Sequence, residues 1–209
     1  MDYLVGSRRT APLIIPGQAV QEVWNNALTG VKTKSKKLTE AHKSLVREIR
    51  ELDRDLGPYA EDAATSLESF AKWHGDWFDV EAQQYFIGTV KNLTDRAVSM
   101  SVPRVEFSSL AQIRNNTKTP PGFSDPSDNH GDFFIWADFM YALAVSDLSN
   151  VDGIIFVTED GKQDWRLAGV GHPILTAEIR SLTGLPFKLC DLGELFSLAQ
   201  KSIGGRSER

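Results

Sequence analysis

The sequence has a single cysteine, Cys190, among its 209 residues. One cysteine excludes an internal disulfide, which is typical of proteins from a reducing, intracellular compartment. Cys190 ends a short apolar run, so we expect it to be buried in a strand. The sequence also has no apolar run long enough to span a bilayer, and no basic region followed by an apolar core at its start. These absences predict a cytoplasmic protein that does not bind membranes.

The sequence also has no excess of positive charge: its net charge is −5 at pH 7. This average hides an uneven distribution, since residues 31–50 are basic and residues 51–81 are acidic. The basic segment is the best candidate for a contact with nucleic-acid phosphates. A solvated helix face that pairs with the acidic segment is the alternative. The candidate contact residues are Lys32, Lys34, Lys36, Lys37, Lys43 and Arg47.

Short apolar runs alternate with segments of helical periodicity along most of the chain. The runs predict buried strands at residues 12–16, 153–158 and 186–190, the second of them buried on both faces. Helices are expected over residues 19–28, 60–73, 79–100, 173–183 and 192–202, and one helix begins at Asp132. Gly30 should end the first helix, and residues 103–130 should form a polar loop. Strand and helix in alternation predict a parallel sheet with helices on both faces.

A long helical segment follows Gly30 and ends at Gly57-Pro58. Its apolar positions have 4-3 spacing, which is typical of a helix that packs along its length against a partner: Leu38, His42, Leu45, Ile49, Leu52 and Leu56. We expect it to form an antiparallel hairpin with the next helix, basic on one arm and acidic on the other. The hairpin is a candidate contact for a homodimer or for a partner protein.

Three acids occupy places where an α/β fold exposes carboxylates. Glu22 lies in the first turns of the helix that follows the first strand, Asp132 opens an apolar helix, and Asp160 follows a strand. Side chains beyond the carboxyl ends of parallel strands gather at one edge of the sheet. Each acid alone also has an ordinary structural explanation, as a first-turn acid, a helix cap or a turn residue.

Three segments together resemble a known family, the PIN-like domains. The first segment runs from Leu13 to Asn26 and includes Glu22; the second joins Pro120-Pro121-Gly122-Phe123-Ser124-Asp125 to Gly131-Asp132-Phe133-Phe134-Ile135-Trp136; the third runs from Phe156 to Trp165. The resemblance covers about residues 10–198 and is to the branch with a helical insertion after the second acid. It implies one domain over residues 1–209, with a three-layer α/β fold, a central parallel sheet, helices on both faces and a long helical hairpin insertion at about residues 31–100.

The resemblance also implies a metal-dependent endonuclease that cuts RNA, or single-stranded DNA. Glu22, Asp132 and Asp160 would hold one or two Mg²⁺ or Mn²⁺ ions, which prefer carboxylate oxygens and water. One ion would activate a water for attack on the phosphodiester, and the other would stabilise the leaving oxygen. Thr158, Asp164 and Asp125 are expected to support this site.

The sequence departs from the family pattern at its start. PIN-like domains begin with a strand that carries an aspartate, whereas Asp2 has no apolar strand before it. The start is therefore either truncated or a natural variant without the first acid. Losing one carboxylate should weaken metal binding, so a module that binds nucleic acid or a partner protein without cleavage is the alternative function. A toxin-like subunit that needs an antitoxin partner is a third reading.

Overall fold

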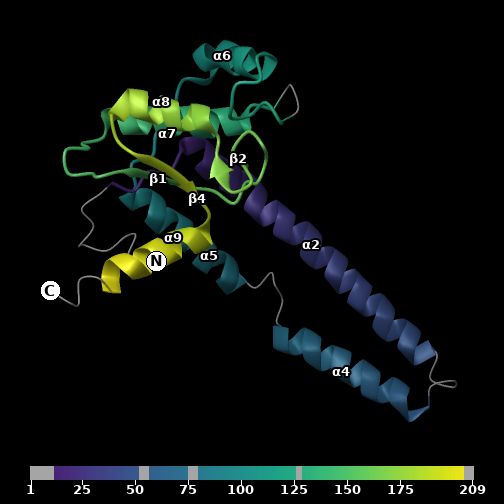
Figure 1. Cartoon of the computed structure of the whole chain (residues 1–209). Helices are drawn as coiled ribbons and strands as arrows, with labels where there is room; N and C mark the ends of the chain where they lie inside the picture. The colour runs from purple at the N-terminus through teal and green to yellow at the C-terminus, as the bar shows by residue number, and fades with distance from the viewer. Residues whose placement is uncertain (1–11, 52–56, 75–79, 126–128, 205–209) are drawn as a thin grey trace. The chain divides into compact units, whose positions relative to one another are not determined.

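The computed structural model describes residues 12–51, 57–74, 80–125 and 129–204. The expectations for Asp2 and for the strand before it fall on residues outside these ranges. The described residues belong to two compact units (Figure 1). One unit contains the chain up to Val20 together with residues from Arg96 onward, and the other contains Gln21–Asp95.

The first helix is longer than the sequence indicates. Helix α2 (Gly17–Glu51) continues through Gly30 without interruption, so the expected break at Gly30 is wrong. A glycine in a helix interior costs only about 1 kcal/mol relative to alanine, and good helix formers such as the lysines that follow compensate for it.

The unit formed by Gln21–Asp95 consists of helices. Helix α4 (Pro58–His74) contacts α2 in two places: Nε2 of His42 lies 2.9 Å from the carbonyl oxygen of Leu67, and Arg50 pairs with Glu68 at 2.6 Å. Helix α5 (Val80–Arg96) follows. The side chain of His42 therefore bonds to the backbone of the facing helix α4.

Two strands form a parallel sheet in the other unit, as the sequence predicts. Strand β1 (Ile154–Val157) pairs with β4 (Phe187–Cys190), with Ile154 opposite Phe187 and Val157 opposite Cys190. Cys190 is fully buried, as expected. Helix α8 (Pro173–Thr183) makes the crossover between the strands and ends at Gly184, whose φ of 72° is the left-handed conformation expected for a glycine after a helix.

The core lies between this sheet and the helices α7 (Gly131–Val145) and α8, which run side by side (Figure 1). It is rich in aromatic residues, with rings from α7, β1 and the turn after β1 in edge or stacked contact. The fully or nearly buried members are Trp136, Phe139, Leu143, Ile154, Phe156, Trp165, Leu175, Ile179 and Leu189. The sheet and its helices therefore form one packed body around Trp136.

The buried faces of β1 and α7 differ from those expected. Strand β1 buries Ile154 and Phe156 but exposes Ile155 and Val157, so the expectation of burial on both faces is wrong. The run is uniformly apolar, and its pattern alone does not say which face the helices cover. Helix α7 buries Trp136, Phe139 and Leu143, whereas its equally apolar Phe134 and Ile135 are half-buried and Ala144 is exposed.

The predicted strand at residues 12–16 is reduced to a single bridge. Ile14 pairs with Val98 in parallel orientation, and Gly17 N–H donates to the carbonyl of Met100 at 2.9 Å. Pro12 and Pro16 have no N–H to donate, which limits the length of any ladder here.

Part of the predicted loop at residues 103–130 is helical. Helix α6 (Arg104–Asn116) begins immediately after Pro103, and Ala111 is its buried residue. A small antiparallel pair, β2 (Arg166–Leu167) and β3 (Val170–Gly171), also lies where no strand was predicted. Helix α9 (Leu192–Gly204) follows β4 close to the expected bounds. The described residues are thus mostly helical, and the unit that contains Arg96 onward also has a small parallel sheet.

Candidate metal centre

The turn that follows β1 is held by its own hydrogen bonds. Asp160 N–H donates to Oγ1 of Thr158 at 3.0 Å, and Lys162 N–H donates to Oδ1 of Asp160 at 2.8 Å. The turn closes when Trp165 N–H and Arg166 N–H both donate to the carbonyl of Lys162. The backbone at Asp160 and Lys162 is therefore fixed beyond the carboxyl end of β1.

Three carboxylates meet at the side chain of Lys162. Its Nζ lies 2.7 Å from Oδ1 of Asp125 and 3.2 Å from Oδ2 of Asp160, and it also contacts Oδ2 of Asp132. Asp125 comes from the loop before α7, Asp132 from the first turn of α7, and Asp160 from the turn after β1. We call Asp125, Asp132 and Asp160 the acidic cluster.

Asp132 is positioned by an aromatic residue of the core. The indole Nε1–H of Trp165 donates to Oδ2 of Asp132 at 3.1 Å. Trp165 is 2% exposed and stacks on Phe156, with ring centroids 5.2 Å apart. His130 occupies the N-cap position of α7 without a side-chain cap bond, so Asp132 is a first-turn acid and not the cap.

The electrostatics of the acidic cluster depend on its one cation. Burial raises the pKa of Asp132, the hydrogen bonds from Lys162 and Trp165 oppose that rise, and the negative charge of Asp125 adds to it. Burial alone would lower the pKa of Lys162, but hydrogen bonds to Asp125, Asp132 and Asp160 outweigh it and raise that pKa above the ordinary value. The raised pKa keeps the lysine protonated at neutral pH.

Another acid, Asp164, lies outside the acidic cluster and holds the loop that carries Asp125. It is fully buried, and its Oδ2 accepts from the backbone N–H groups of Gly122 at 2.9 Å and Ser124 at 3.1 Å. Gly122 has a φ of +99°, and a Cβ at this position would lie 3.3 Å from the backbone nitrogen of Phe133. The peptide bond between Pro120 and Pro121 is cis. Asp164 thus connects the turn after β1 to the loop before α7.

Another buried acid, Asp138, was not singled out from the sequence. Its carboxylate accepts from the backbone N–H of Gln18 and of Val102, each at 2.8 Å, and from both terminal nitrogens of Arg104 at 2.9 Å. Asp138 is fully buried and sits in the middle of α7. It joins the beginning of α2 and the beginning of α6 to α7, so its role is structural.

The other predicted residues belong to the Gln21–Asp95 unit. Glu22 lies in the part of α2 that belongs to the Gln21–Asp95 unit, so its predicted role rests on the sequence alone. Lys37, Lys43 and Arg47 are exposed on the same helix, and Arg47 pairs with Glu51 at 3.9 Å. The side chains of Lys32, Lys34 and Lys36 are outside the described part of the structure.

The residue that sequence reasoning missed is Lys162. Its only local signal is a basic residue two positions after Asp160, in a turn rich in charged residues. Its partners Asp125 and Asp132 lie 37 and 30 positions earlier in the chain. Only the tertiary structure brings them together.

The donors of the acidic cluster suit a hard divalent cation, because carboxylate oxygens are the ligands that Mg²⁺ and Mn²⁺ prefer. The Lys162 ammonium is a cation already seated among these oxygens. The spacing is that of an ammonium, since N–O distances of 2.7 and 3.2 Å exceed a magnesium–oxygen distance of about 2.1 Å. Accordingly, among the described residues no three His, Cys, Asp or Glu side chains are already arranged to hold a metal ion.

Comparison with known families identifies the fold. A family model described as a PIN like domain matches residues 61–177, more than half of the 209 residues. The chain belongs to the PIN-like domain family. Searches of curated proteins and of solved structures returned no match. The span of the PIN-like match contains the whole acidic cluster, Lys162 and Asp164, but not Glu22, and it begins inside the segment predicted as an insertion.

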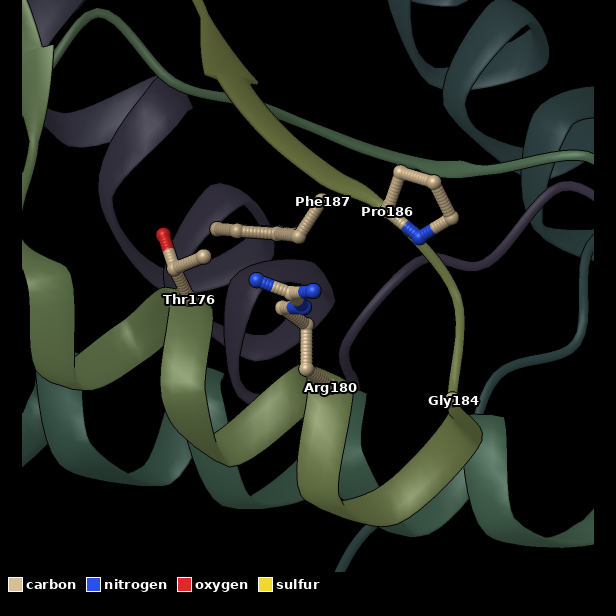
Figure 2. Close-up of a pocket in the computed structure, with 5 residues that line it drawn as sticks. All are labelled: Thr176, Arg180, Gly184, Pro186 and Phe187. Carbon is tan, nitrogen blue, oxygen red and sulfur yellow. The ribbon is translucent and has the colours of Figure 1, made fainter.

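A separate pocket of about 310 Å³ lies at the other end of the PIN-like sheet. Thr176 and Arg180 line it from α8, and Gly184, Pro186 and Phe187 line it from the turn into β4 (Figure 2). This is the amino end of β4, whereas the acidic cluster lies beyond the carboxyl end of the parallel strand β1. The pocket is thus not part of the acidic cluster.

None of the helices in the described segments is long and apolar enough to cross a membrane.

Proposed function

We propose that this PIN-like domain is a metal-dependent endonuclease that hydrolyses phosphodiester bonds of RNA or single-stranded DNA. The observation that supports this function is the convergence of Asp125, Asp132 and Asp160 on one cationic nitrogen. Nucleic-acid cleavage is the activity typical of the family. Asp132 and Asp160 are the proposed ligands, with Asp125 beside them.

When bound, Mg²⁺ or Mn²⁺ would supply an activated water and neutralise charge on the phosphodiester. The chain's own residues hold the ligands in place. Trp165 orients Asp132 through its indole N–H, Oγ1 of Thr158 fixes the turn at Asp160, and Asp164 fixes the loop that leads to Asp125. Asp125 lies in the loop before α7, Asp132 in the first turn of α7 and Asp160 in the turn after β1, so three separate segments bring the carboxylates together.

Glu22 remains a proposed ligand on its sequence motif. Lys37, Lys43 and Arg47 remain proposed contacts for phosphates because they are exposed and basic. Lys32, Lys34 and Lys36 belong to the same proposal through the sequence alone. A homodimer or partner contact through α2 and α4 is proposed on the same basis.

The test is single-turnover cleavage of end-labelled RNA and single-stranded DNA with Mn²⁺, Mg²⁺ or EDTA. Asp132→Asn and Asp160→Asn should each reduce cleavage about 100-fold or more, because a carboxylate ligand matters at least as much as the groups that orient it. Asp95→Asn, in an exposed ion pair with Lys91 in the other unit, is the matched control and should leave cleavage unchanged. Glu22→Gln tests the motif-based ligand in the same assay. Cleavage that survives both Asp132→Asn and Asp160→Asn would rule out the proposal.

The second candidate function is a PIN-like module that binds nucleic acid or a partner protein without cutting. It is favoured by the ammonium seated in the acidic cluster, which satisfies the three carboxylates without a metal ion. This function predicts that labelled RNA is retained in a filter-binding assay equally well with Mn²⁺ and with EDTA, and that it is never cleaved. Metal-dependent turnover excludes it.

A further inference from the structure

The side chain of Lys162 occupies the centre of the acidic cluster, and the proposed nuclease mechanism gives it no role. Its three contacts are all to carboxylate oxygens of Asp125, Asp132 and Asp160. These oxygens are the donors that a divalent cation needs. Lysine and metal ion therefore require the same oxygens.

The two cations exclude each other on charge as well as space. A divalent ion and an ammonium that share the same oxygens would lie only a few ångströms apart, and their repulsion in a partly buried site is strong. Metal–oxygen distances of about 2.0–2.6 Å also require the carboxylates to close in from the spacing set by the ammonium. The ammonium must leave before the ligands contract.

The surroundings of Lys162 allow its head group to leave while the turn stays folded. Its backbone N–H is bonded to Asp160, and its carbonyl accepts from the N–H groups of Trp165 and Arg166, both at 3.0 Å. The side chain, in contrast, is 35% exposed, and within the described residues its head group bonds to the carboxylates of the acidic cluster. A change of side-chain rotamer is sufficient to release the ammonium into solvent, where it is well hydrated.

The carboxylates themselves are less free to move. Asp125 and Asp132 are 10% and 15% exposed, and Asp132 is also bonded to the buried Trp165. Asp160 is fixed through its turn by Thr158. The three carboxylates therefore stay close to one another when Lys162 departs, and small shifts bring them to metal–oxygen distances.

We infer that Lys162 is a built-in competitor of the divalent cation: its ammonium fills the cluster of Asp125, Asp132 and Asp160 and must swing out before a metal ion binds there. The inference rests on the proposed metal centre. It follows that the lysine lowers the affinity for metal and stabilises the metal-free protein. Nucleic-acid binding is not required for this exchange.

The direct test is calorimetric titration of the full chain with Mn²⁺ alone, comparing the unsubstituted protein with Lys162→Met. The variant should bind Mn²⁺ about tenfold more tightly or better, because it removes the competing cation while keeping an unbranched side chain of similar length. Lys188→Met is the matched control, since Lys188 is exposed on β4 and its loss changes the net charge equally. The control should bind Mn²⁺ like the unsubstituted protein.

A second measurement uses the unsubstituted protein and so does not depend on how well Lys162→Met folds. An amine-acylating reagent followed by peptide mass spectrometry reports how exposed each lysine is. Labelling of Lys162 should rise several-fold when Mn²⁺ or Mg²⁺ is added, and labelling of Lys188 should not change.

Two results overturn the inference, and they differ in what they say of the metal centre. In the first result, the unsubstituted protein and Lys162→Met bind Mn²⁺ with equal affinity, and the extent of Lys162 labelling does not change when the metal is added. A metal centre then exists, but Lys162 does not compete for it. If neither protein binds Mn²⁺, the metal centre and the inference fail together. Tighter binding by Lys162→Met alone, with metal-dependent labelling, supports both.

Discussion

Trp165 donates its indole N–H to the carboxylate of Asp132 at 3.1 Å, which joins the aromatic core directly to the acidic cluster. Trp165 stacks on Phe156, and Asp132 lies in the first turn of α7 with its side chain 15% exposed. The bond constrains the carboxylate without covering it. Packing in the core therefore sets the orientation of a proposed metal ligand.

The first prediction concerns Trp165→Phe, which keeps a ring in the core and removes the N–H donor. Mn²⁺ affinity should fall about tenfold, the lower end of the range for partners that orient metal ligands. Titration calorimetry measures the change. Trp136→Phe is the matched control, because Trp136 donates its indole N–H to Glu178 outside the acidic cluster at 2.7 Å. It should lose stability but not Mn²⁺ affinity; an equal loss of affinity in both variants would mean that core packing, and not the bond to Asp132, matters.

The second prediction follows from the raised pKa of Asp132 in the metal-free protein. A carboxyl whose pKa is raised in the folded state stabilises the fold below its unfolded pKa, and this stabilisation is lost as the pH rises through the folded pKa. Asp132→Asn should therefore unfold at higher urea concentration than the unsubstituted protein at pH 7 in EDTA, with the gain vanishing toward pH 4. Asp147→Asn is the contrast, because a hydrogen bond from the backbone of Ser149 lowers the pKa of Asp147. This variant should show no gain at pH 7.

The third prediction concerns the loop that carries Asp125. Gly122→Ala should lower the free energy of unfolding by about 1–2 kcal/mol, because a φ of +99° is strained for alanine and the new Cβ meets the backbone of Phe133. Urea denaturation measures this cost. Gly161→Ala is the control, since a Cβ there would meet nothing within 4 Å. Equal stability of the two variants would show that the loop adjusts freely.

The fourth prediction concerns the buried charge of Asp138. Asp138→Asn should destabilise the protein by about 3 kcal/mol, because it breaks the ion pair between a fully buried carboxylate and the partly exposed Arg104 and weakens the bonds to two backbone N–H groups. Asp95→Asn removes an ion pair that is exposed on both sides, so it should cost no more than about 0.5 kcal/mol. Thermal and urea unfolding distinguish the two. A cost at Asp138 as small as that at Asp95 would show that the network does not stabilise the fold.

The sequence predicts those elements whose signal is local. Strand β4 and helix α8 were predicted because an apolar run and helical spacing are signals carried by neighbouring residues. Helix α6 was missed because its apolar residues do not mark one buried face: Val105, Leu110 and Ile113 are exposed, and Ala111 is its buried residue. Strand β1 was found, but its exposed face was not, since only packing decides which side of an apolar run is covered.

The candidate site divides in the same way. Asp132 and Asp160 could be placed at the start of a helix and after a strand, and the structure has them there, although their role as ligands stays a prediction. Lys162 could not be placed, because its three partners come from different segments. Asp138 was hidden in an otherwise apolar helix, where one polar residue gives no indication of what it binds.

The hydrogen bonds that the Asp138 carboxylate accepts from two backbone N–H groups have a consequence for hydrogen exchange. The amide hydrogens of Gln18 and Val102 belong to segments far apart in the chain, yet both are held by one fully buried carboxylate. Local fraying of either segment alone would leave that carboxylate short of donors in a place that water does not reach. The two amides should therefore exchange at matching rates, in openings that release both segments together.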